Sequence, residues 1–134
     1  DYYIDIMTAN LVKPGTREKF QVFVLPNLYG DIITDEAAQL QGGVGTAGSA
    51  NMGDQYAMFE AVHGSGLRMM EEGRGDYANP ASILKAAELM LRHIARNDAA
   101  DRLLAAMDRC DVKITGRPDG ATAAQYADAI MTLL

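Results

Sequence analysis

Clusters of glycine and proline divide this chain into alternating strand-like and helix-like segments. The breaks fall at Lys13-Pro14-Gly15, at Pro26-Asn27, at Gly42-Gly43 and at Asn79-Pro80. Glycine and proline interrupt regular structure, and strands that alternate with helices are typical of a sheet covered by helices. The chain has 134 residues, which is about the length of one domain. The pattern therefore predicts an α/β fold in which short strands lie between helices.

The spacing of apolar residues predicts the individual elements. Helices are expected where apolar residues recur every three or four positions, over residues 2–12, 31–40, 80–94, 98–109 and 122–133. Short apolar runs predict strands at 21–25, 57–62 and 112–115. Loops are expected at 42–53 and 63–79, and a turn at 116–120. Asn79 and Thr122 are expected to cap the helices that follow them. The methionines at 69, 70, 90, 107 and 131 are interpreted as core residues.

Composition and charge disfavour several classes of protein. A formal net charge of −6 leaves no broad basic surface for binding nucleic acid. The longest apolar runs are far shorter than the roughly 20 residues of a membrane-spanning helix. The single cysteine, Cys110, cannot form an internal disulfide and no signal segment opens the chain, so a cytoplasmic location is expected. A helical pattern that begins directly at Asp1 indicates a piece of a longer protein.

Two aspartates form the densest group of chemically active side chains. Asp31 and Asp35 follow the strand predicted at 21–25 and are four residues apart, so on a helix they project from nearly the same side. Oxygen ligands on this spacing would suit a shared Mg²⁺ or Mn²⁺ ion. The alternative is a solvated pair in the first turn of the helix, where the helix dipole favours acidic residues. Spacing alone leaves both interpretations open.

A loop of small residues with one of the two histidines follows the strand predicted at 57–62. His63 and Ser65 lie in this loop, but nothing around them resembles the sharp strand-to-helix turn of a serine hydrolase nucleophile. The glycines at 42–45 lack the strand and helix that flank a dinucleotide fingerprint. Neither segment predicts an activity by itself.

The segment PNLYGDIITDEAAQLQGGVGTAGSANMGDQYAMFEAVHGS, from Pro26 to Ser65, resembles the signature of the metal-dependent β-decarboxylating dehydrogenases. This family includes isocitrate, 3-isopropylmalate, homoisocitrate and tartrate dehydrogenases, and NLYGDI with SANMGD is closest to the isocitrate enzymes. The likeness extends over essentially the whole chain. It implies the C-terminal portion of the family's fold, with residues 1–20 as an interface helix and connection and residues 21–134 as part of the large, cofactor-binding domain.

The resemblance also implies a metal site. Asp31 and Asp35 match the two carboxylates that hold Mg²⁺ or Mn²⁺ in one subunit. Asp5 matches a third carboxylate, which is donated across the dimer interface to the site of the partner. In such a site the cation chelates the substrate's hydroxyl and carboxylate and stabilises the enolate that decarboxylation leaves.

A nucleotide site for NAD or NADP is implied as well. Asn27 and Glu60 match positions near the nicotinamide, the loop of His63, Gly64 and Ser65 matches the one that packs on the adenosine, and Asn79 matches an adenine-binding asparagine. Arg68 stands where the family carries aspartate for NAD or lysine for NADP. Arginine can neutralise a 2′-phosphate, but Met69 replaces the tyrosine that accompanies the lysine, so the choice of nucleotide stays open.

The resemblance therefore predicts part of an oxidoreductase that converts isocitrate to 2-oxoglutarate. The family's catalytic residues belong to a part of the enzyme N-terminal to this chain, so no catalytic residue is expected here and the chain alone is expected to be inactive. A homodimer or larger homo-oligomer is expected, with the N-terminal part of the enzyme as partner. The alternatives are a related substrate (3-isopropylmalate, homoisocitrate or tartrate) and a non-catalytic subunit that binds nucleotide or metal.

Overall fold

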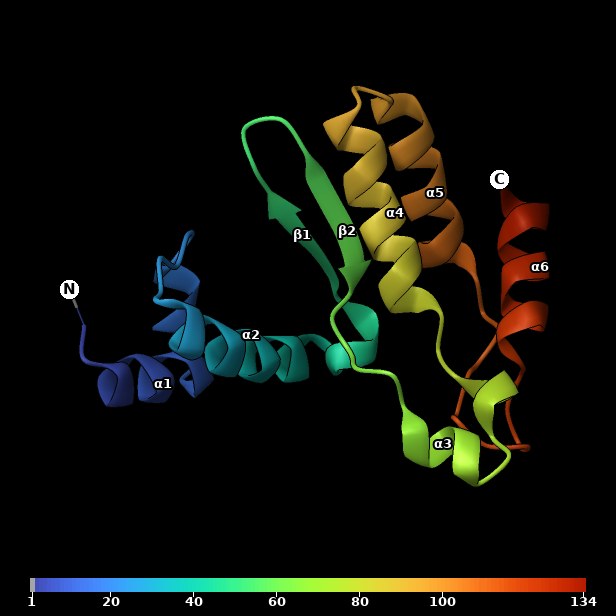
Figure 1. Cartoon of the computed structure of the whole chain (residues 1–134), viewed down its shortest axis with the longest axis horizontal. Coiled ribbons are helices and arrows are strands. Elements are labelled where there is room, and N and C mark those ends of the chain that lie inside the picture. Colours follow the sequence, from blue (N-terminus) through green and yellow to red (C-terminus); the bar gives the residue numbers. More distant parts are fainter. Residues whose placement is uncertain (1) are drawn as a thin grey trace. The chain divides into compact units, whose positions relative to one another are not determined.

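A computed structural model describes residues 2–134, and the chain divides into two compact units, Asp1–Gly43 and Val44–Leu134 (Figure 1). The helices longer than one turn are α1 (Ile4–Val12), α2 (Asn27–Gln41), α3 (Leu67–Glu71), α4 (Ala81–His93), α5 (Asn97–Arg109) and α6 (Ala123–Leu133). The two strands within the described residues are β1 (Gly48–Met52) and β2 (Ala57–Ala61), and short 3-10 turns lie at Arg17–Lys19, Val44–Thr46 and Gly75–Tyr77. None of the helices in this part of the chain is long and apolar enough to cross a membrane.

The first unit is a pair of packed helices. α1 contacts α2, and the buried side chains of these two helices are Met7, Leu11, Ile33 and Ala38. The helix predicted at 2–12 is confirmed. α2 begins at Asn27, four residues before the predicted start: Pro26 occupies the N-cap position, and its carbonyl accepts the Gly30 N–H at 2.8 Å.

The strand predicted at 21–25 is wrong. The segment is not hydrogen-bonded in a sheet, and Val22 and Val24 are 78% and 93% exposed. A strand needs a neighbouring strand for its backbone groups, and the two strands of the described chain pair with each other instead. The apolar pattern of this segment is therefore exposed rather than buried in this chain.

The second unit is a hairpin covered by helices. β1 and β2 are antiparallel, with Gly48 opposite Ala61 and Met52 opposite Ala57. Figure 1 shows α4 lying along this hairpin, with α5 on the other side of α4. The main core lies between α5 and α6 and is formed by the buried side chains of Leu103, Ala106, Met107, Tyr126 and Ile130.

The prediction of a loop at 42–53 is wrong for residues 48–52, which form β1. β1 passes very close to α4 at its first residue, where a Cβ at Gly48 would lie 2.5 Å from the backbone nitrogen of Ala86. The glycine at this position therefore reflects tight packing rather than a flexible loop. The strand predicted at 57–62 is confirmed as β2, in an antiparallel hairpin.

Two further segments differ from the prediction. The loop predicted at 63–79 contains α3 and the turn at Gly75–Tyr77. The strand predicted at 112–115 is absent from the described chain, because Val112 and Ile114 pack against the helical core and no strand lies beside them. Alternating burial, which is typical of a strand, arises here from an irregular segment lying on helices.

The remaining helices confirm the predictions, with shifts of one or a few residues at their ends. Thr122 caps α6 in a capping box: its hydroxyl accepts the Gln125 N–H at 3.2 Å and the Gln125 side chain accepts the Thr122 N–H at 2.9 Å. The interpretation of the methionines as core residues is wrong in most cases. Met107 is buried, but Met70, Met90 and Met131 are exposed.

Candidate metal and nucleotide sites

The two predicted metal ligands of α2 lie on one side of the helix and are exposed. Asp31 and Asp35 are one helical turn apart, about 6 Å along the axis. Because α2 begins at Asn27, Asp31 lies in its second turn and Asp35 in its third. The dipole of a helix acts on charges within the first turn only. Stabilisation by the helix N-terminus therefore does not account for this pair.

Like charges four residues apart on a helix destabilise it by a few tenths of a kcal/mol. None of the salt bridges found within residues 2–134 involves Asp31 or Asp35. The pair therefore presents free carboxylate oxygens to solvent. Oxygen donors of this kind fit Mg²⁺ or Mn²⁺, which take carboxylates together with water and substrate oxygens.

Asp5, the third predicted ligand, lies in the first turn of α1 and accepts the backbone N–H of Ile6 at 2.8 Å. It does not join the other two carboxylates within this chain. Among the residues that the structure describes, no three His, Cys, Asp or Glu side chains are close enough to hold a metal ion together. Within residues 2–134, Asp31 and Asp35 therefore have no third carboxylate, histidine or cysteine close enough to share a cation with them.

The second unit contains a cavity of about 390 Å³, a size within the range of small-molecule sites. Its wall comes from the turn before β1, the loop after β2 and the segment before α4. The lining residues are Val44, Gly45, His63, Gly64, Ser65, Gly66, Met69, Met70, Gly75, Ala78 and Asn79. Small residues leave backbone accessible on several sides, and two methionines supply an apolar surface that suits a flat ring.

The cavity brings together the residues predicted to hold the adenosine, namely the loop 63–65 and Asn79. The His63 ring nitrogen Nδ1 lies 3.0 Å from the Gly64 carbonyl oxygen. The Asn79 Oδ1 accepts the Ala81 N–H at 2.9 Å at the start of α4, which fixes the amide. The Asn79 Nδ2 group is then the part of the amide that can donate to a ring nitrogen.

The other three predicted nucleotide-binding residues do not line this cavity. Asn27 belongs to the first unit, at the start of α2. Glu60 is exposed on β2 and accepts a hydrogen bond from the Asn51 amide at 2.9 Å across the hairpin. Arg68 is on α3, with its side chain 88% exposed.

Arg68 belongs to a chain of ion pairs beside the cavity. Its Nε donates to Glu72 at 2.8 Å, Arg74 donates to the other oxygen of Glu72, and Arg74 also donates to the Gly116 carbonyl. The hydrogen bonds from Arg68 and then Arg74 hold the pKa of Glu72 below its ordinary value. An exposed pair of this kind is weak, so Arg68 can exchange Glu72 for another anion at little cost.

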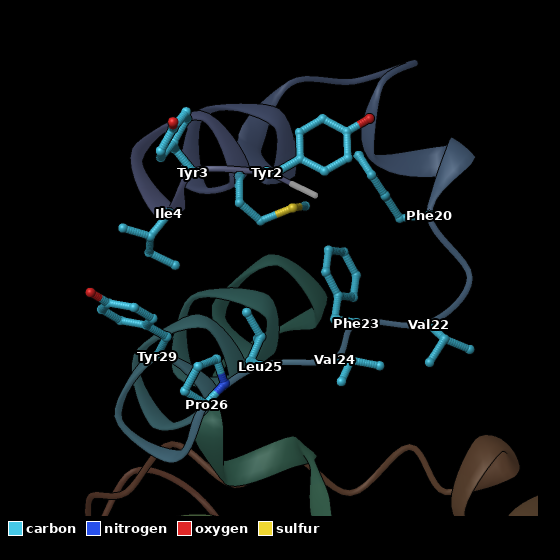
Figure 2. A pocket seen from close by; sticks show the side chains of 11 residues that line it. Tyr2, Tyr3, Ile4, Phe20, Val22, Phe23, Val24, Leu25, Pro26 and Tyr29 are labelled. Atoms are coloured by element: carbon cyan, nitrogen blue, oxygen red, sulfur yellow. The ribbon is translucent and has the colours of Figure 1, made fainter.

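The first unit has a cavity of about 530 Å³ with a different character, shown in Figure 2. Its wall is apolar and aromatic, and the rings of Tyr2 and Phe20 and of Phe20 and Phe23 are 5.5 Å and 5.4 Å apart. Figure 2 shows Tyr29, Pro26 and Leu25 on the side opposite the beginning of α1. Such a wall offers no set of charged groups for an anionic substrate.

Several residues of the second cavity lie outside the sequence prediction. Val44, Gly45, Met69, Met70, Gly75 and Ala78 line it together with the predicted loop. The glycine at 45 was visible only as part of a small-residue stretch. Its position at the wall depends on the packing of the Val44–Thr46 turn against α4, which no local pattern reveals.

Comparison with known proteins gives a consistent family. The model of the isocitrate/isopropylmalate dehydrogenase family matches residues 1–119. A protein of Rickettsia bellii named isocitrate dehydrogenase (NADP) is 55% identical over 100 residues, which is 74% of this chain and 20% of that protein. The 3-isopropylmalate/3-methylmalate dehydrogenase of Methanocaldococcus jannaschii is 42% identical over 109 residues, covering 81% of this chain and 31% of that protein.

The fold also matches solved structures. The isocitrate dehydrogenase of Methylococcus capsulatus superposes with a TM-score of 0.85 at 34% identity, over 99% of this chain and 40% of that one. The TT0538 protein of Thermus thermophilus gives the same TM-score, 0.85, over 98% of this chain and 27% of that one. The chain spans between a fifth and a third of the length of the curated relatives it matches.

Proposed function

Because the chain belongs to the isocitrate/isopropylmalate dehydrogenase family, we propose that it supplies metal-binding and nucleotide-binding residues to an oxidative decarboxylase. The proposed substrate is a 2-hydroxy acid, isocitrate, which is converted to 2-oxoglutarate and carbon dioxide with NAD or NADP as oxidant. The name of the Rickettsia bellii relative supports isocitrate. The observation that carries the proposal is the pair of free carboxylates on α2, outside the reach of the helix dipole.

In this proposal Asp31 and Asp35 hold a divalent cation through carboxylate oxygens. A cation bound there supplies Lewis acidity toward the substrate's hydroxyl and carboxylate, and the nicotinamide of a bound nucleotide supplies the hydride acceptor. Asp5 serves the site of a partner subunit in a homo-oligomer. The loop 63–65 and Asn79 bind the adenosine, because they line one cavity of suitable size.

The acid and base of the reaction are proposed to lie outside these 134 residues, since the relatives are three to five times longer than the matched region. The chain alone is then a binding module without turnover. Adding the remaining part of the enzyme as a separate polypeptide restores isocitrate-dependent reduction of nucleotide. A complex that binds isocitrate and nucleotide without turnover contradicts the proposal and favours a non-catalytic subunit.

The first test is a calorimetric titration of the chain with Mn²⁺, and then with NAD and NADP separately. We expect saturable binding of Mn²⁺ and of at least one nucleotide, because neither requires a catalytic residue. The Asp31→Asn and Asp35→Asn variants should lose Mn²⁺ binding and keep nucleotide binding. A folded chain that binds neither contradicts the proposed sites.

Arg68 decides between the two nucleotides in this proposal. It is the cation on α3 next to the cavity, and an exposed guanidinium can pair with a 2′-phosphate in place of Glu72. Replacing it in Arg68→Asp should weaken NADP binding relative to NAD. An unchanged ratio of the two affinities excludes this role for Arg68.

The substrate itself is tested with the assembled enzyme. Isocitrate, 3-isopropylmalate, homoisocitrate and tartrate are compared by kcat/KM at saturating nucleotide. Isocitrate should give the highest value. The similarity to the Methanocaldococcus jannaschii enzyme makes 3-isopropylmalate the second candidate, and a higher value for it contradicts the assignment of isocitrate.

A further inference from the structure

Ser82 is a fully buried polar residue at the start of α4. It is the second residue of the helix, and 0% of it is exposed. A buried hydroxyl is stable only with hydrogen-bond partners. Ser82 has two from outside its own helix: its Oγ accepts the Val62 N–H at 3.0 Å and donates to the Ala47 carbonyl.

Val62 and Ala47 lie at the open end of the hairpin. The ladder between β1 and β2 ends with Gly48 opposite Ala61. In the same register the next opposing residues are Ala47 and Val62, and the Ser82 hydroxyl joins them. The hydroxyl thereby fixes how the two segments that leave the hairpin are placed relative to α4.

Both segments continue directly into the wall of the 390 Å³ cavity. Val62 is followed by His63, and Ala47 is preceded by the turn that holds Gly45. The third part of the wall, Asn79, is tied to the same helix start through its hydrogen bond with the Ala81 N–H. The start of α4 therefore holds three separate parts of the cavity wall, two through the Ser82 hydroxyl and one through the Ala81 N–H.

We propose that Ser82 is a positioning residue for nucleotide binding: it sets the spacing of the cavity wall without lining the cavity itself. This inference rests on the proposed function of the cavity. Its physical basis is that Ser82→Ala leaves the part-buried Val62 N–H and Ala47 carbonyl without their shared partner. The backbone has to move to satisfy them, and the loop 63–65 moves with it.

The test compares three versions of the 134-residue chain: the unaltered chain, Ser82→Ala, and Ile130→Val as a matched control. Ile130 is 3% exposed in the core between α5 and α6 and does not line the cavity, so its truncation destabilises the same unit by a different route. NAD and NADP affinities are measured by calorimetric titration, and melting temperatures by circular dichroism. Both variants should melt at a lower temperature than the unaltered chain.

The affinities separate positioning from general stability. We expect Ser82→Ala to bind nucleotide about tenfold more weakly, because the two hydrogen bonds that hold the cavity wall to α4 are lost, while Ile130→Val binds as the unaltered chain does. Equal affinity of Ser82→Ala and the unaltered chain overturns the inference and leaves the proposed function standing. A parallel loss in Ile130→Val also overturns it, because the effect is then one of stability. If the unaltered chain is folded and binds no nucleotide, the result contradicts the proposed function itself, on which this inference rests.

Discussion

The metal site proposed for the first unit depends on two exposed carboxylates. On α2, Asp31 and Asp35 repel each other, and the start of the helix at Asn27 places both beyond the turn in which the dipole compensates such charges. A site that keeps an unfavourable pair exposed gains from it only when a cation is present. The proposed site therefore implies that stability without metal and affinity for metal are opposed at these two positions.

The variant Asp35→Asn tests that opposition. We expect Mn²⁺ binding to weaken at least about tenfold, because a charged ligand is lost. The metal-free chain should become slightly more stable, by about 0.2–0.5 kcal/mol, because the repulsion with Asp31 is removed. Mn²⁺ titration followed by electron paramagnetic resonance and urea denaturation measure the two effects.

Asp54→Asn is the control for this variant, since Asp54 is exposed in the turn between β1 and β2. It makes the same chemical change in the other unit and should alter neither quantity. Normal Mn²⁺ affinity of Asp35→Asn would show that Asp35 is not a ligand.

Tyr126 gives the second unit a pH dependence at the alkaline end. Burial, followed by the charges of Cys110 and Asp108, raises the pKa of its phenol above the ordinary value of 10.0. The unfolded chain then loses this proton at lower pH than the folded chain does. The contribution to stability is full below pH 10 and is lost as the pH rises through the folded pKa.

We expect the unaltered chain to lose stability above about pH 10 more steeply than Tyr126→Phe does. Urea denaturation across this range measures the difference. Tyr56→Phe, at a position that is 84% exposed, should behave like the unaltered chain. Identical slopes for the unaltered chain and Tyr126→Phe contradict the role of the buried phenol.

At the scale of elements, the predicted helices formed, whereas of the strands predicted at 21–25, 57–62 and 112–115 only the one at 57–62 did. A helix satisfies its backbone hydrogen bonds within one segment, so periodicity and caps such as Thr122 suffice to find it. A strand depends on a second segment. The apolar run at 21–25 has no strand beside it in the described chain, while β1, made of small residues, is a strand because β2 and α4 lie against it.

In the candidate sites, too, residues that belong to a sequence motif were predictable, and a residue whose role depends on packing was not. The loop 63–65 and Asn79 were predicted from a family motif, and the structure places them in one cavity. The role of Ser82 could not be predicted from the family motif, because nothing in the sequence distinguishes a buried serine near a helix start from an exposed one. Its burial and its two partners become visible only when the hairpin and α4 are folded together.

The contribution of the capping box of α6 to stability can be tested by mutation. Thr122→Ala removes the acceptor for the Gln125 N–H, and we expect the chain to lose about 1 kcal/mol of stability. Thr132→Ala, later in the same helix, is the control because its hydroxyl only donates to the Asp128 carbonyl within the helix. Urea denaturation monitored at the helix signal measures both. Equal effects would show that the cap contributes nothing specific.

At the scale of the whole molecule, the chain consists of two units with unequal cores. The second unit combines a hairpin with α4, α5 and α6 around a continuous set of buried side chains. The first unit buries only a few residues of α1 and α2 and exposes large apolar ones such as Val22 and Val24. Burial of apolar area is the main stabilising term, so the second unit should be the more stable.

We expect residues 44–134, expressed alone, to unfold in one cooperative transition and to bind nucleotide as the full chain does. Residues 2–43 alone should show little helix, because two short helices with a small core are marginal in water. Thermal unfolding followed by circular dichroism and nucleotide titration are the measurements. Loss of cooperative unfolding in 44–134 would show that the first unit is required for the fold of the second.

The contact of Gly48 with the backbone of α4 limits how the second unit can evolve. Any other residue at this position would place a Cβ 2.5 Å from the Ala86 nitrogen, against backbone that cannot rotate away. A substitution at position 48 therefore requires the hairpin to move away from α4. At Gly64, by contrast, an added Cβ would meet nothing within 4 Å, so neighbouring atoms do not bar its substitution. In a saturation library, position 48 should tolerate no replacement, and lineages that diverge elsewhere should keep this glycine fixed.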